Sequence, residues 1–127
     1  MKHFLIGGLA AAAILTGGHS RDGLAAAERL QLQLTPSISV APASVIVRAI
    51  VEHDAENRQL EIVADSENFY RRTVVDLDGD HAPKVNELRL LSIPGGEYEV
   101  TATLYDSRGA RTMAHRTLTI MSPGGDR

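Results

Sequence analysis

The amino-acid sequence predicts an all-β protein, a single sandwich of seven strands that follows an N-terminal signal peptide. Three observations indicate this fold class. Apolar and polar residues alternate with a period of two from about residue 30 to residue 121. Clusters of Pro, Gly, Asn and Asp interrupt the alternation at short intervals, as turns between strands do. The chain has 127 residues, which suits one domain, because a domain commonly has about 100–200 residues.

The first 27 residues differ from the rest and are typical of a signal peptide. A short basic start, Met1–His3, precedes an apolar run at residues 4–15. That run is too short to cross a bilayer, which takes about 20 residues. Small residues between 18 and 27 offer more than one cleavage site, and an uncleaved anchor is the alternative. We therefore expect an exported protein, periplasmic or extracellular, with a signal peptide at 1–27, a sandwich at 28–121 and a flexible tail at 122–127.

The first four predicted strands have apolar residues on one face and end at turn signals. Leu30, Leu32 and Leu34 alternate with glutamines, and Pro36 ends that strand. The β-branched content of the second strand also favours a sheet. The four strands cover residues 30–34, 44–52, 60–65 and 69–75.

The last three predicted strands cover residues 84–93, 97–104 and 110–121. Pro94–Gly96 separates the first two of these strands as a turn. Between the last two, residues 106–109 form a hairpin connection, and Gly109 takes a positive φ at little cost.

The segment Pro94–Gly109, PGGEYEVTATLYDSRG, resembles the E–F turn, F strand and F–G hairpin of immunoglobulin-like sandwiches. The fibronectin type III and PKD-like branches are the most similar. The resemblance implies that Tyr98 closes the E–F corner through a hydrogen bond to nearby backbone, and that Val100 stands where antibody domains carry a cysteine. Tyr98, Val100 and Gly109 are therefore expected to be structural. The chain lacks both the cysteines and the tryptophan of antibody domains, so the resemblance is to the wider superfamily.

Composition excludes several classes of function. The net charge is −3, and no basic run is longer than Arg71–Arg72, which argues against nucleic acid. No cysteine is available for a disulfide or a thiolate nucleophile. The sequence has no zinc-protease, nucleophile-elbow or phosphate-loop motif. We expect no enzymatic activity and no cofactor on these grounds.

An acidic loop offers one candidate metal site. Asp76, Asp78 and Asp80, followed by Glu87, have the carboxylate spacing of a calcium-binding EF-hand loop. The glycine that the loop needs at its sixth position is replaced by His81. A solvated acidic turn is therefore the favoured interpretation, and calcium binding is the alternative.

The last predicted strand offers a second candidate metal site. Met113 and His115 lie on one face of that strand by parity, together with Met121. Methionine and histidine are ligands that copper accepts. The competing interpretation is a packed methionine beside a surface histidine.

The remaining candidates form a binding surface made of Tyr70, Arg71, Arg72 and Tyr105. Tyrosine and arginine are enriched among residues that dominate protein–protein binding energy. The competing interpretation is a solvated strand face whose arginines pair with Glu61 or Glu99. The sequence thus predicts a non-catalytic exported domain that binds another envelope protein, with no membrane insertion beyond the signal segment. A metal-binding sandwich and a carbohydrate-binding accessory domain are the alternatives, the latter weakened by the absence of tryptophan.

Overall fold

The computed structural model describes residues 29–124. The predicted signal peptide at 1–27 lies outside the described residues, as do the last three residues of the predicted tail. Within the described part the regular elements are eight β-strands and one short 3₁₀ helix. They are β1 (Leu30–Thr35), β2 (Ile38–Val40), β3 (Ala43–Val51), β4 (Asn57–Asp65), β5 (Tyr70–Asp76), η1 (Gly79–His81), β6 (Val85–Ile93), β7 (Gly96–Asp106) and β8 (Gly109–Met121).

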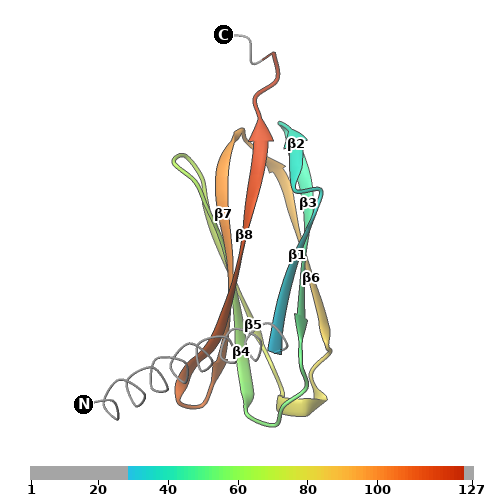
Figure 1. Ribbon diagram of the computed structural model, residues 1–127, viewed down its shortest axis with the longest axis vertical. Helices are drawn as coiled ribbons and strands as arrows, with labels where there is room; N and C mark the ends of the chain where they lie inside the picture. Colours follow the sequence, from blue (N-terminus) through green and yellow to red (C-terminus); the bar gives the residue numbers. More distant parts are fainter. Residues whose placement is uncertain (1–28, 125–127) are drawn as a thin grey trace, which may run out of the picture.

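The strands form two sheets that pack face to face (Figure 1). One sheet has three strands in the order β1-β3-β6, and the other has five in the order β2-β8-β7-β4-β5. All pairs are antiparallel except that of β2 with β8. The prediction of an all-β, two-sheet fold is confirmed.

The predicted count of seven strands is corrected to eight in residues 29–124, because β2 was not foreseen. This strand has three residues and lies between Pro36 and Pro42, both of which follow cis peptide bonds. Three residues are too few to display an alternating pattern. Its conformation is set by parallel pairing with the end of β8, where Ile38 lies opposite Thr119 and Val40 opposite Met121. The chain thereby passes from the three-stranded sheet at β1 to the five-stranded sheet at β2.

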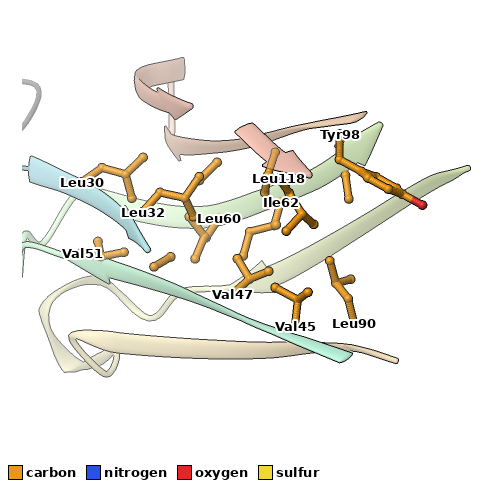
Figure 2. Close-up of a cluster of buried hydrophobic side chains, with 14 of the residues drawn as sticks. Leu30, Leu32, Val45, Val47, Val51, Leu60, Ile62, Leu90, Tyr98 and Leu118 are labelled. Atoms are coloured by element: carbon orange, nitrogen blue, oxygen red, sulfur yellow. The ribbon is translucent and has the colours of Figure 1, made fainter. Parts of the chain in front are cut away.

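The core consists of the inward-facing positions of both sheets. The burial of β3 alternates along its whole length, so that Val45, Val47, Ala49 and Val51 are buried, as strand geometry requires. Figure 2 shows the β3 valines meeting Leu60, Ile62 and Leu118 from the opposite sheet. Each fully buried aliphatic side chain contributes about 1.5–3 kcal/mol relative to an exposed one. Since the chain has no cysteine, no disulfide adds to this burial.

Tyr98 ties the start of β7 to the turn that precedes it. Its side chain is buried, and its hydroxyl donates a hydrogen bond of 2.6 Å to the carbonyl oxygen of Pro94. Its ring meets the ring of Phe69 edge to face, with centroids 5.8 Å apart. Val100, two residues further along β7, is fully buried. Gly109 has φ +131° at the end of the β7–β8 hairpin, a conformation that favours glycine.

Candidate functional site

Polar side chains meet on the outer face of the five-stranded sheet, where β5, β4 and β7 lie side by side. In the strand register, Glu61 of β4 lies opposite Val74 of β5 and Thr103 of β7. Arg72 lies two residues before Val74 along β5, and Tyr105 lies two residues after Thr103 along β7. Diagonal neighbours at this separation are within reach of long and aromatic side chains. The register therefore allows both side chains to converge on Glu61.

The Glu61 carboxylate bridges the two neighbouring strands. One of its oxygens accepts a hydrogen bond from Nε of Arg72, and the other accepts one of 3.1 Å from the hydroxyl of Tyr105. The Glu61 side chain is 17% exposed, whereas that of Arg72 is 55% exposed. We call these three residues the Glu61 cluster.

The electrostatics of the Glu61 cluster keep its two donors protonated. The hydrogen bond to Glu61 raises the pKa of Tyr105 above its ordinary value, with desolvation and the carboxylate charge as further causes. The pKa of Arg72 is also raised, first by its hydrogen bond to Glu61 and then by the charge of that carboxylate. The cluster is thus a fixed arrangement of a cation, an anion and a phenol on the sheet surface.

The structure brings together only some of the four predicted binding residues. Tyr70 lies opposite Asp65 on the same face as Arg72, and its side chain is 62% exposed. Arg71 lies opposite the buried Ala64, so it occupies a core-facing position on the edge strand β5. Arg72, Tyr105 and Tyr70 therefore share one face, and Arg71 belongs to the other.

Sequence reasoning named Glu61 only as a pairing partner for solvated arginines, and it missed its central place. The alternation of β4 indicates that Glu61 is on the polar face. The alternation does not predict which residues of β5 and β7 lie beside Glu61, because that depends on the order and register of three strands.

The carboxylates of the acidic loop are not brought together as a metal site. Asp76 accepts a hydrogen bond of 3.4 Å from the side chain of Gln59, while Asp80 lies 3.5 Å from the His81 ring. Asp78 precedes η1, and all three aspartates are exposed. Among residues 29–124 no group of three or more His, Cys, Asp or Glu side chains is arranged to hold a metal ion.

The described residues of this loop give the calcium alternative no support, and the favoured interpretation of an acidic turn stays a prediction. Leu77, which stands between Asp76 and Asp78 in the sequence, is buried in the core. Its side chain anchors the loop there. Gly79 has φ +55°, and a side chain there would come within 2.9 Å of the Ala55 carbonyl oxygen. The loop is therefore a tight turn packed against the backbone of Ala55.

Met113 and His115 are both exposed on the outer face of β8. Nδ1 of His115 lies 3.2 Å from the Thr101 hydroxyl and 3.3 Å from a carboxylate oxygen of Glu99. These contacts give the histidine ring protein partners on β7. Within the described residues the neighbourhood provides no group of three His, Cys, Asp or Glu ligands. That search does not include methionine, so copper binding by Met113 and His115 stays a prediction.

Comparisons with known proteins identify the fold and no family. No protein-family model matches the chain, and no curated protein matches it. Among solved structures, superoxide reductase (neelaredoxin) from Ignicoccus hospitalis is 16% identical with a TM-score of 0.60, covering 72% of this chain and 80% of that one. A single-residue variant of the same reductase is 18% identical with a TM-score of 0.60, covering 76% and 82%. A family 76 glycoside hydrolase from a bovine Bacteroides thetaiotaomicron strain is 20% identical with a TM-score of 0.50, covering 72% of this chain and 20% of that one.

These similarities correct the prediction of a non-catalytic protein. That prediction used the rule that a small sandwich with solvated loops rarely offers a catalytic cleft. A superoxide reductase is an enzyme, and its chain shares this fold over most of its length. The fold therefore gives no reason to deny catalysis. At 16–18% identity the likeness is one of fold, and the activity does not follow from it.

No helix within the described residues is long and apolar enough to cross a membrane.

Proposed function

We propose that the chain is an immunoglobulin-like sandwich whose outer five-stranded face binds another protein. The bond from the Tyr98 hydroxyl to Pro94, four residues upstream, supports the first part, because immunoglobulin-like domains close the E–F corner with such a tyrosine. The apolar start of the sequence supports an exported chain, so the expected partner is an envelope protein. The proposal assigns a binding surface and is independent of whether the domain also catalyses a reaction.

The Glu61 cluster is the observation that supports this surface. Arg72 and Tyr105 are both held by the Glu61 carboxylate, so less side-chain freedom is lost when a partner binds. Tyr70 stands on the same face as a largely exposed aromatic ring. Arginine and tyrosine supply a disproportionate share of protein–protein binding energy.

Alanine variants tested against the envelope fraction check this proposal. A protein that is retained by the wild-type chain should bind Tyr70→Ala and Arg72→Ala about 30-fold more weakly, the effect of losing a residue that supplies about 2 kcal/mol. Arg48→Ala is the matched control, because Arg48 forms an ion pair of 2.6 Å with Glu87 on the outer face of the other sheet. Retention that is equal for all three variants would contradict the proposal.

Superoxide reduction is the activity that the fold similarity suggests for this chain. One-electron oxygen chemistry is usually supplied by a metal or an organic cofactor. The sequence contains no cysteine, and the described residues contain no group of three His, Asp or Glu side chains arranged for a metal. These residues do not fit such a centre. A direct test measures superoxide consumption by the chain supplemented with iron or copper and compares it with consumption by the same metal alone.

A further inference from the structure

One side of β8 is paired along only a small part of its length. On that side β2 pairs with Thr119, Ile120 and Met121, whereas β8 begins at Gly109 (Figure 1). Residues 109–118 have no ladder partner on this side among the described strands. β1 lies against β8 here, but it is paired within the other sheet. Within residues 29–124 the five-stranded sheet thus has an open edge along residues 109–118 of β8.

The backbone groups at this edge can be assigned from the β2 pairing. The Thr119 amide donates to the carbonyl of Ser37, and the Met121 carbonyl accepts from the amide of Ala41. Backbone groups alternate sides along a strand, so the N–H and C=O groups of Thr117 and His115 point to the same side of β8 as those of Thr119 and Met121. The His115 carbonyl is covered by the side chain of its own neighbour, since Nη1 of Arg116 donates to it at 2.8 Å.

A groove of about 310 Å³ lies between this edge and β1. It is lined by Leu32, Gln33, Leu34, Ser37, Arg116 and Thr117. Arg116 lies opposite the fully buried Val100 in the β7–β8 register, which is a core-facing position, yet its side chain is exposed. A guanidinium has five N–H donors, and the bond to His115 is the only hydrogen bond that this side chain forms within residues 29–124.

We propose that this groove binds a short extended peptide segment that carries an acidic side chain and adds to the open edge of β8. Main-chain hydrogen bonds to Thr117 and His115 would provide affinity, as in other cases of strand addition. The amide of the incoming strand would replace Arg116 at the His115 carbonyl. The released guanidinium would then form a charge-assisted pair with the acidic side chain.

Arg116 also determines which strands are rejected. An apolar strand at this edge would cover a guanidinium that forms no ion pair within residues 29–124, and inward-pointing charges are a known protection of sheet edges. A second copy of the chain is disfavoured, because two-fold pairing of β8 with β8 would place both Arg116 side chains at the same interface. An acidic strand instead supplies a counter-charge to the Arg116 guanidinium. The same residue therefore attracts acidic strands and rejects apolar ones.

Fluorescence anisotropy with a labelled heptapeptide, Thr-Val-Thr-Glu-Thr-Val-Thr, tests the proposal on the full chain. The same peptide with a central lysine and a version with alternate amides N-methylated are the comparison probes. We expect each comparison peptide to bind at least about tenfold more weakly, a difference of about 1.4 kcal/mol. No binding of the glutamate peptide at about 1 mM, where the binding free energy is only about −4.1 kcal/mol, would overturn the proposal.

Charge reversal identifies the anchoring residue. Arg116→Glu should invert the preference between the glutamate and lysine peptides, and Arg116→Gln should weaken glutamate-peptide binding while the thermal melt shows a folded chain. Arg71→Glu is the matched control, because Arg71 is also an exposed arginine at a core-facing position of an edge strand. Equal affinities for both peptides, or equal effects of Arg116→Glu and Arg71→Glu, would overturn the proposal. The groove is distinct from the Glu61 cluster, since its lining residues come from β1, β8 and the turn at Ser37, whereas the cluster lies on β4, β5 and β7.

Discussion

Tyr98 combines two contributions to stability in one side chain, and truncation separates them. Tyr98→Phe removes the bond to the Pro94 carbonyl and should lower the free energy of unfolding by about 1 kcal/mol. Tyr98→Ala also removes a fully buried ring and should cost about 3–5 kcal/mol, by analogy with other aromatic truncations in cores. Urea denaturation measures both values. Tyr70→Ala is the control, expected to lie within about 0.5 kcal/mol of wild type because its ring is exposed. A urea midpoint for Tyr98→Ala equal to that of wild type would contradict the structural role of Tyr98 at the turn after Pro94.

At the scale of elements, Glu61 connects β4 to both β5 and β7, and we expect the connection to β7 to depend on pH. The pKa of Tyr105 is raised in the folded chain, so the neutral phenol is the form that folding favours. Its contribution is present below the unfolded pKa of about 10 and is lost as pH rises through the higher folded value. Urea denaturation at pH 8 and at about pH 11 should therefore show a larger loss of stability for wild type than for Tyr105→Phe. Equal losses for the two proteins would show that the bond to Glu61 does not influence stability.

At the scale of the whole molecule, the two sheets share one core and should unfold together. Buried side chains from both sheets form a single cluster, with Leu30 and Val47 on one side and Leu60 and Leu118 on the other (Figure 2). Far-UV circular dichroism and tyrosine fluorescence should thus give coincident denaturation curves, the signature of a two-state transition. A reducing agent should not shift them, because the chain has no cysteine. Two separate midpoints would mean that one sheet is stable without the other.

The sequence by itself determined the features that depend on local periodicity. Alternation identified which face of β3 is buried, and the turn residues at Pro94–Gly96 and at Gly109 separated β6, β7 and β8. Both signals arise from a residue and its near neighbours, so they can be read before any pairing is known.

Only the tertiary structure decided the features that depend on pairing between distant strands. The strand β2 has a conformation set by β8, far along the chain, with Ile38 opposite Thr119. The Glu61 cluster exists because β5, β4 and β7 are neighbours in one register, and the exposed edge at Arg116 exists because β2 stops short. Alternation tells which face a side chain occupies but not which strand lies beside it, because a period of two is the same in every register.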